Sequence, residues 1–438
     1  MEIQEFSKPV KIFVILFCLL ALFYFAGLPL WKLFQAHQAA QEENQATLAY
    51  QQNRSQEAEL GYLSSLKRYQ SIGDNKNVAK QYDTLGELYA GLHRLPEAIE
   101  MYLKGVELHQ SLDEKEEVAR GYSNLGSLYA INKEPQNAEL MFSKSLALSQ
   151  ALGRQEDVAK QYSYLGNLYA TQNDVQRAQD MYRHSLELYL PLNQPKQLAK
   201  IYTMLAGLEA GQGNLSQARE NYLKSLEIYQ QLQQPKDIAQ CYDMLGTLYA
   251  QEGQIQKAEM MYLKGIEINQ QLDDQEILVK QYQSLGVFYL KTKNFQQARE
   301  AFLKSLYTNE MLAEKDKLVT QYHSRVKDFE LQQAHQRWID IADQYENLGK
   351  LSYTYADWSH AEEMFLKSLE LNQKLERQES VANQYGNLGY VYHQQGQRSE
   401  AQEMLVKSLE IFQQLKKVPQ VQKIQQFLSE IQTTPTKK

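Results

Sequence analysis

One block of sequence recurs every forty residues along most of this 438-residue chain. In one copy the residues that recur at fixed offsets are Tyr82, Leu85, Gly86, Tyr89, Ala98, Tyr102 and Gly105. Copies at the same period are led by Tyr122, Tyr162, Tyr202, Tyr242 and Tyr282, and two later copies by Tyr345 and Tyr385. A fixed period of roughly 20–50 residues is the signature of a stacked repeat array. The chain is therefore predicted to be built from one repeated structural unit.

Each copy contains two apolar stripes that are typical of α-helices. The first stripe, spaced by four, three and four residues, is Val78, Tyr82, Leu85 and Tyr89. The second stripe is Ala98, Tyr102 and Gly105. Prolines mark the start of the second segment or the connections between copies: Pro96, Pro135, Pro195 and Pro235. Each copy is predicted to be a helical hairpin, helix A followed by helix B.

The glycine inside helix A needs a reason, because glycine costs about 1 kcal/mol relative to alanine in a helix. It recurs as Gly86, Gly126, Gly166, Gly246, Gly286, Gly349 and Gly389. We expect helix B to cross helix A there, too closely for a side chain, with small residues such as Ala98 and Gly105 as the matching contacts. The aromatic residue of helix B, such as Tyr102, is then expected to fill the space between neighbouring hairpins.

The pattern Tyr-x2-Leu-Gly-x2-Tyr, followed by Ala, an aromatic and a small residue, resembles the tetratricopeptide repeat. The period of forty exceeds that family's usual length of about 34 residues. It is similar to the longer variety in kinesin light chains and spindle-orientation adaptors. The resemblance covers residues 41–416 and implies an all-α fold, a right-handed α-solenoid of stacked helical hairpins. It also implies a concave groove, lined by helices A, that binds a partner protein or peptide.

The composition excludes some classes of function. The net charge of −7 and a pI near 5.8 argue against a nucleic-acid-binding protein, which would normally show a basic face. Charged residues are plentiful and proline is scarce, so the repeats are predicted to be folded. Cys18 lies in an apolar run and Cys241 in a helix A, so the two cysteines are not a disulfide framework.

Residues 12–31 form a run of twenty residues without charge, between Lys11 and Lys32. As a helix it would span about 30 Å, the hydrocarbon thickness of a bilayer. We predict an uncleaved N-terminal transmembrane helix; a cleaved signal peptide, a lipoprotein signal and a buried helix are the alternatives. Lys8 and Lys11 precede the run, which favours a bacterial inner-membrane protein with the repeats outside the cytoplasm.

Two stretches depart from the regular repeat. The copy led by Tyr202 has Ala206 and Glu209 at the glycine and second tyrosine positions, and is either a weak unit or a flexible joint. Between residues 314 and 340 the pattern restarts too early, which predicts a lengthened helix A or an extra helix. That insertion is either a truncated repeat or a partner or dimer contact, for which the candidates are Phe329, Trp338 and Ile339.

The chain is accordingly divided into eight predicted segments: an N-terminal flank (1–11), a transmembrane helix (12–31), a helical stalk with a degenerate first helix A (32–53), regular repeats (54–313), an irregular helical insertion (314–340), two further repeats (341–416), a C-terminal capping helix (417–431) and a tail (432–438). The capping helix follows from an amphipathic pattern, which a repeat array needs at its open end.

No active site is predicted. The eight histidines are dispersed and form no metal-type cluster with cysteine or carboxylate residues, so no metal and no cofactor are expected. There is no glycine-rich phosphate loop and no Ser/His/Asp set that the repeats would bring together.

The groove is expected to be lined by the stripe of helix A opposite the apolar one. Its first member is basic in Lys80, Arg120, Lys160, Lys200 and Lys280. Other predicted groove residues are Asp83, Glu87, Ser123, Asn167 and Thr203. A basic ladder would bind an acidic or carboxylate-bearing peptide; the alternative is that these side chains only keep helix A soluble. The predicted function is a non-enzymatic membrane-anchored scaffold or receptor, or alternatively a regulatory sensor that closes on a small peptide or ligand.

Overall fold

The computed structural model describes the backbone of residues 8–322 and 328–433, and the side chains of residues 29–317 and 333–431. Within these ranges the regular secondary structure is α-helix throughout, in two compact units. Unit 1 (Met1–Gln212) contains α1 (Lys8–Gln51), α2 (Ser55–Ile72), α3 (Asn75–Gly91), α4 (Leu95–Ser111), α5 (Lys115–Ile131), α6 (Pro135–Ala151), α7 (Gln155–Thr171), α8 (Val175–Tyr189) and α9 (Pro195–Gly211). Unit 2 (Gly213–Lys438) contains α10 (Leu215–Gln231), α11 (Pro235–Gln251), α12 (Ile255–Gln271), α13 (Gln275–Lys291), α14 (Phe295–Tyr322), α15 (Asp328–Thr354), α16 (Trp358–Lys374), α17 (Gln378–Gln394), α18 (Arg398–Gln414) and α19 (Val418–Thr433).

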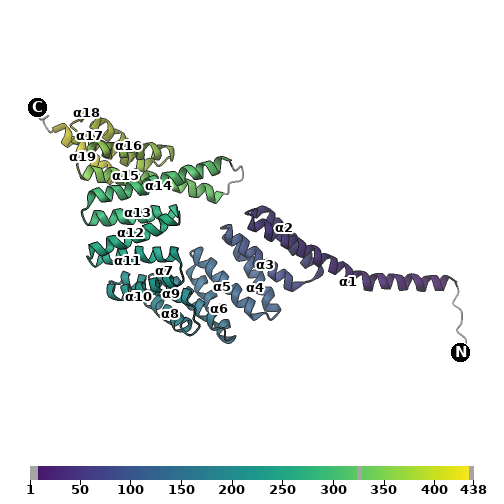
Figure 1. Ribbon diagram of the computed structural model, residues 1–438. Coiled ribbons are helices and arrows are strands. Elements are labelled where there is room, and N and C mark those ends of the chain that lie inside the picture. The colour runs from purple at the N-terminus through teal and green to yellow at the C-terminus, as the bar shows by residue number, and fades with distance from the viewer. Residues whose placement is uncertain (1–7, 323–327, 434–438) are drawn as a thin grey trace. The chain divides into compact units, whose positions relative to one another are not determined.

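Within each unit, consecutive helices pack as antiparallel pairs and the pairs stack in series (Figure 1). The predicted all-α fold of stacked helical hairpins is confirmed in both units. Two helices of seventeen residues and two turns of three residues make up the forty-residue period, as in α3 and α4.

The turns share one backbone device. His93 lies in the left-handed region with φ 57°, its N–H bonds the Ala90 carbonyl at 3.0 Å, and the N–H of Arg94 bonds the Tyr89 carbonyl at 2.9 Å. This is the Schellman arrangement, which satisfies the last carbonyls of a helix. Left-handed residues recur every twenty positions from Asn53 to Lys293, and again from Ala356 to Lys416. Turn geometry therefore sets the helix length, and most of these positions are not glycine.

The glycine of helix A faces the aromatic residue of its own helix B. A Cβ added to Gly86 would lie 2.8 Å from the Tyr102 ring, and one added to Gly126 would lie 2.6 Å from the Phe142 ring. Helix B thus crosses close to this glycine as predicted, but the group that meets Gly86 is the aromatic ring, whereas the small residue Gly105 lies against Asp83. The ring comes this close to the helix A backbone only because the glycine has no side chain. The aromatic residue also reaches the next hairpin, as predicted, since the Phe142 ring lies 5.4 Å from the Tyr164 ring of α7.

The small residues of helix B instead approach an earlier turn of helix A. The hydroxyl of Ser145 donates to the Ala119 carbonyl at 2.8 Å, and that of Ser185 donates to the Ala159 carbonyl at 2.8 Å. Ser305 makes the same bond to Val279 in unit 2. A larger side chain would separate the two helices. The buried serine hydroxyl finds its hydrogen-bond partner by donating to a backbone carbonyl.

The irregular stretch consists of two lengthened helices. α14 has 28 residues and α15 has 27, so a helix B and the following helix A are both extended (Figure 1). The guanidinium of Arg337 holds three helices together: it lies 2.5 Å from Glu276 of α13 and 2.7 Å from Asp316 of α14. The side chains of residues 318–332 lie outside the described part of the chain.

The first helix, α1, is continuous from Lys8 to Gln51 and extends beyond α2 (Figure 1). Its C-terminal part packs on α2 through Ala39, Ala46 and Ala49, which are buried. Among the residues that the structure describes, no helix has the length and apolar character needed to cross a bilayer. Residues 12–28 of the predicted span lie outside the described side chains, so the transmembrane helix stays a prediction.

The boundary between the two units falls between Gln212 and Gly213, directly after α9. This helix is the irregular helix A led by Tyr202, in which Ala206 and Glu209 are both buried. The alternatives of a weak unit and a flexible joint both stay open.

Candidate partner-binding site

The predicted basic residues of unit 1 are exposed, but two of them already meet carboxylates. The ammonium of Lys80 lies 2.9 Å from Glu43 of α1. The guanidinium of Arg120 pairs with Glu117 and lies 3.6 Å from Asp83. Lys160 lies over the Tyr164 ring, 5.6 Å from its centroid. Because acidic side chains alternate with the basic ones, the helix A surface of α3 and α5 is mixed in charge.

Lys200 is also exposed on α9, and Lys280 is exposed on α13 in unit 2. Neither residue is drawn into the core, so both remain available to an acidic partner. The basic ladder stays a prediction. It is favoured by the exposure of Lys160, Lys200 and Lys280.

The polar residues predicted beside the ladder are mostly engaged within the chain. Asp83 and Ser123 are buried, and Ser123 accepts a hydrogen bond from the Gln161 amide at 3.0 Å. Asn167 accepts one from the Tyr182 hydroxyl at 2.6 Å, and Thr203 donates to the Ala199 carbonyl at 3.0 Å. Their burial and internal bonds leave Asp83 and Ser123 little surface for a partner to touch.

Glu87 is the exposed member of this group. Crowding by neighbouring helices raises the pKa of its carboxyl, the nearby Asp83 carboxylate adds to that effect, and Arg120 opposes it. Glu87 therefore adds negative charge to a surface that was predicted to attract acidic peptides.

A charged cavity of about 590 Å³ lies between α3, the end of α4 and the start of α5. Its lining carries both signs of charge: Lys76, Lys80, Lys115 and Arg120, with Asp83, Asp113, Glu114, Glu116 and Glu117. Such a lining suits a ligand that also carries both signs, and it gives an acidic peptide no clear advantage.

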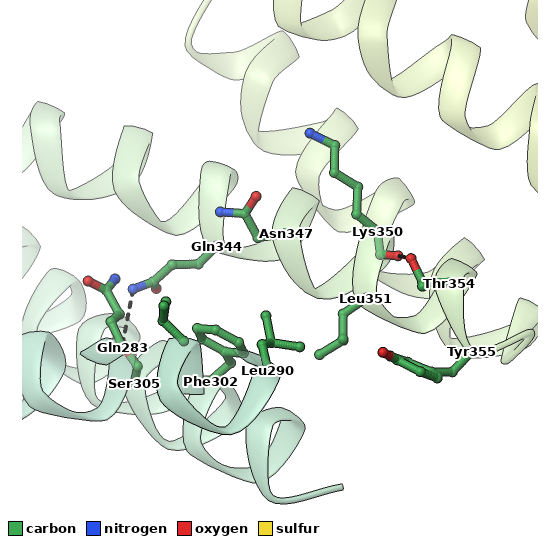
Figure 2. Close-up of a pocket in the computed structure, with 11 residues that line it drawn as sticks. Gln283, Leu290, Phe302, Ser305, Gln344, Asn347, Lys350, Leu351, Thr354 and Tyr355 are labelled. Atoms are coloured by element: carbon green, nitrogen blue, oxygen red, sulfur yellow. Dashed lines mark hydrogen bonds between the residues drawn. The ribbon is translucent and has the colours of Figure 1, made fainter. Parts of the chain in front are cut away.

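Unit 2 contains a cavity of a different kind, about 570 Å³ in volume, between α13, α14 and α15. Figure 2 shows Leu290, Phe302 and Leu351 gathered in its centre, with the Lys350 ammonium pointing away from them. That ammonium lies 2.5 Å from Glu346. The amide of Gln344 donates to the Ser305 hydroxyl at 3.2 Å and joins α15 to α14 beside the cavity (Figure 2).

The rim of this cleft combines apolar and polar groups. Val287 and Tyr355 are exposed at 44% and 40%. The polar rim residues are Gln283, Asn347, Lys350 and Thr354. An apolar floor with a few convergent polar groups is the usual construction of a ligand site. These six rim residues and five others make up the eleven residues of what we call the α13–α15 cleft; the other five are Leu290, Phe302, Ser305, Gln344 and Leu351.

Sequence reasoning missed the α13–α15 cleft, although one signal was present. Val287 stands where five copies have a polar or charged residue, namely Glu87, Ser127, Asn167, Thr247 and Lys350; the other two have Gly207 and Tyr390. An aliphatic residue at a groove-facing position that is polar in most copies marks a place where the surface serves another purpose than solubility.

Of the residues predicted as partner contacts in the insertion, Trp338 and Ile339 are not among those that line the α13–α15 cleft. Trp338 is partly buried and packs against the core formed by Ile341, Tyr345 and Leu348, and Ile339 is also partly buried. Trp338 thus contributes to the stability of unit 2. Phe329 lies outside the described side chains. Among the described residues no group of histidine, cysteine and carboxylate side chains could hold a metal ion.

Comparison with known families identifies the repeat. Residues 197–271 and 340–414 match a tetratricopeptide repeat model, and residues 280–310 match a second one. Residues 92–226 match the family described as soluble NSF attachment protein, SNAP. The predicted tetratricopeptide repeats are confirmed. No curated protein matches the chain in sequence.

Several solved structures are similar. A signal transduction ATPase with numerous domains and a tetratricopeptide repeat sensor, from Pyrococcus horikoshii, is 14% identical with a TM-score of 0.56; the match covers 85% of this chain and 51% of that one. The apo form of RapI is 13% identical with a TM-score of 0.52, over 63% of this chain and 99% of that one. BtubC (BKLC) from P. vanneervenii is 21% identical with a TM-score of 0.41, over 56% and 90%. The first two share the fold of this chain.

Proposed function

We propose that this chain is a non-enzymatic scaffold or receptor that binds a protein or peptide partner through its tetratricopeptide repeats, with the α13–α15 cleft as the main site. The observation that carries the proposal is the cleft itself. Leu290, Phe302 and Leu351 form an apolar floor that Val287 leaves open at the rim. Polar rim groups such as Asn347 can bond the backbone of a bound peptide.

The expected ligand is a peptide with one bulky apolar side chain that enters the cleft. A cavity of about 570 Å³ is within the size range of small-ligand pockets, roughly 300–1,000 Å³, and exceeds the volume of one side chain. The flanking polar residues, Gln283 and Thr354, would contact the peptide on either side. Lys350 is paired with Glu346, so it favours neither an acidic nor a basic neighbour.

A peptide library displayed on phage and selected against the full chain tests this proposal. We expect the selected peptides to share an apolar anchor and to bind Val287→Glu at least ten times more weakly, about 1.4 kcal/mol. The matched control is Val406→Glu, because Val406 is exposed at 43%, close to the 44% of Val287, but lies on α18 outside the cleft. Equal loss in both variants, or none in Val287→Glu, would contradict the assignment.

The second part of the proposal is attachment to a membrane through residues 12–31, with the repeats outside the cytoplasm of a bacterial cell. It is supported by the described residues at the end of the apolar run and directly after it. Leu30, Trp31, Leu33 and Phe34 are 46–67% exposed on α1. At about 100° per residue they lie within an arc of about 160°, so they form one exposed apolar face of the helix at the end of the run. Tryptophan and lysine next to a span are typical of the bilayer interface, and Lys32 lies among them.

Extraction of membranes at alkaline pH tests the attachment. The full chain should stay in the pellet, while Leu19→Arg with Leu22→Arg should release it, because each charge in a span opposes insertion by about 2.5–3.5 kcal/mol. Leu48→Arg with Leu60→Arg is the control, since both leucines are exposed outside the run. A wild-type chain found in the supernatant would refute the attachment.

Reporter fusions then test the orientation. Alkaline phosphatase fused after Lys438 should be active, and a fluorescent protein that matures only in the cytosol should stay dark. The reverse pair of results would place the repeats in the cytoplasm.

A further inference from the structure

One buried cluster in unit 1 joins three helices through a single histidine. His109 lies in the last turn of α4 and is 4% exposed. Its Nε2 is 3.2 Å from Oδ2 of Asp83 on α3, and its Nδ1 is 2.7 Å from Oε2 of Glu114, the residue that precedes α5. The imidazole therefore lies between two carboxylates, each on a different element.

This geometry requires two protons. A neutral imidazole has one N–H and one lone pair, so only one of its nitrogens can donate a hydrogen bond. Here both nitrogens face carboxylate oxygens, which accept when ionised. The second proton is held either by the ring, as imidazolium, or by one of the two carboxyl groups. Burial raises the pKa of the Asp83 carboxyl, while His109 and Arg120 oppose that rise. Without the second proton, a lone pair would face a carboxylate in a buried place.

The charges around the cluster come from every element packed against it. The charged and titratable side chains there are Lys76, Lys80 and Glu87 on α3, Asp113 in the turn, and Lys115, Glu116, Glu117 and Arg120 on α5. The nearest cations are the guanidinium of Arg120, 3.6 Å from Asp83, and the ammonium of Lys76, 3.6 Å from Glu114. Lys76 meets Oε1 of Glu114 and Arg120 meets Oδ2 of Asp83, so each cation contacts a carboxylate and not the imidazole. Neither cation supplies the proton that the contact between the imidazole and a carboxylate needs.

The stacked fold does not require this cluster. One repeat later, the three positions hold Ser123, Ser149 and Arg154. Gly105 makes room for it, because a Cβ there would lie 2.5 Å from Oδ1 of Asp83. The corresponding residue of the next repeat, Ser145, bonds helix A in the ordinary way. The cluster is thus a local addition to the hairpin formed by α3 and α4.

We propose that Asp83, His109 and Glu114 form a proton-dependent clamp that controls the charged cavity of unit 1. With both protons present, the imidazole holds α3 and the turn into α5 together. Loss of the second proton makes one histidine–carboxylate contact repulsive, and Glu114 turns toward the cavity that it lines. The cavity between α3 and α5 then changes in shape and gains negative charge, so its capacity to hold a ligand depends on pH.

The full chain with labelled histidines, studied by NMR between pH 5.5 and 8.5, gives the first test. The His109 signals, identified by their loss in His109→Asn, should report two ring protons or a proton shared with a carboxyl at low pH, and a change within the range. Asparagine is a safe replacement, because unit 2 has Asn269, Asn309 and Asn372 at this register. A His109 ring with one unshared proton across the whole range would overturn the proposal.

Hydrogen exchange gives the second test. The Glu114 amide donates to the His109 carbonyl at 3.0 Å and closes the turn between α4 and α5. Corrected for intrinsic rates, exchange in residues 112–117 should rise at least tenfold from pH 6 to pH 8.5 in the wild-type chain, and should not change with pH in His109→Asn. His184→Asn is the control, since His184 is exposed on α8 beside Glu187. A pH-independent wild type, or a pH-dependent His109→Asn, would refute the clamp.

Discussion

Asp243, on α11, should make unit 2 less stable at neutral pH than at acid pH. Its Oδ1 is buried and has no hydrogen-bond partner in the described part of the chain. Burial raises the pKa of this carboxyl from 3.8 to about 6. Asp83 holds the same register in unit 1, but His109 and Arg120 lie beside it there. Asp243 has Asn269 in place of that histidine, so its charge is left uncompensated.

The sign and the size follow from proton linkage. Between pH 3.8 and about 6 the folded chain binds a proton at Asp243 that the unfolded chain has lost. The stabilisation from this proton is complete below pH 3.8 and is lost as the pH rises through about 6. A shift of about 2 units corresponds to roughly 3 kcal/mol. Because the side chain is partly exposed, we expect Asp243→Asn to raise the unfolding free energy by about 1–3 kcal/mol at pH 8 and by much less at pH 4.

Urea unfolding, followed by tryptophan fluorescence, measures this effect. Trp338 and Trp358 both lie in unit 2 and report on its unfolding. Midpoints are compared because a repeat array need not unfold in one step. Glu227→Gln, which removes an exposed carboxylate from α10, is the control. An Asp243→Asn midpoint unchanged at pH 8, or raised equally at pH 4 and pH 8, would refute the argument that burial of the charge is the cause.

Three further predictions concern the repeat in unit 1, and their assay is urea unfolding followed by circular dichroism of the helices, because Trp338 and Trp358 report on unit 2. Gly126→Ala should lower the unfolding free energy by about 1–3 kcal/mol, because its Cβ would lie 2.6 Å from the Phe142 ring. Gly211→Ala should instead raise it, by up to about 1 kcal/mol, since Gly211 is helical with open space around its Cβ position. Lys133→Gly should raise it by about 0.5–1 kcal/mol, because Lys133 has a φ of 60°. Equal effects of the two alanine substitutions would mean that the ring contact is unimportant, and a destabilising Lys133→Gly would mean that the turn is unstrained.

Much of the fold could be predicted because it depends on periodicity. The spacing of Tyr82, Leu85 and Tyr89 defines a helix face, and its recurrence every forty residues defines the stack. The partner of Gly86 could not be predicted in the same way. A small residue shows that something comes close, but whether Tyr102 or Ala98 comes close depends on how far helix B is rotated about its axis, which spacing alone leaves open.

The site was less predictable for a related reason. Lys80 and Arg120 look alike in the sequence, yet each meets an acidic side chain of another helix. Lys80 pairs with Glu43 of α1, and Arg120 lies near Asp83 of α3. The α13–α15 cleft combines side chains from three helices, and its opening depends on where α15 lies after the long α14.

The sequence by itself determined the repeating hairpin, its length and the all-α class, because these follow from local helix preference and a strict period. Only the tertiary structure decided which polar residues are buried or hydrogen-bonded within the chain and which remain exposed to a partner. Asp83 is buried against His109 while Val287 is exposed beside Leu290, the opposite of what their polarity suggests. Burial is set by the neighbouring helices, and no single repeat contains that information.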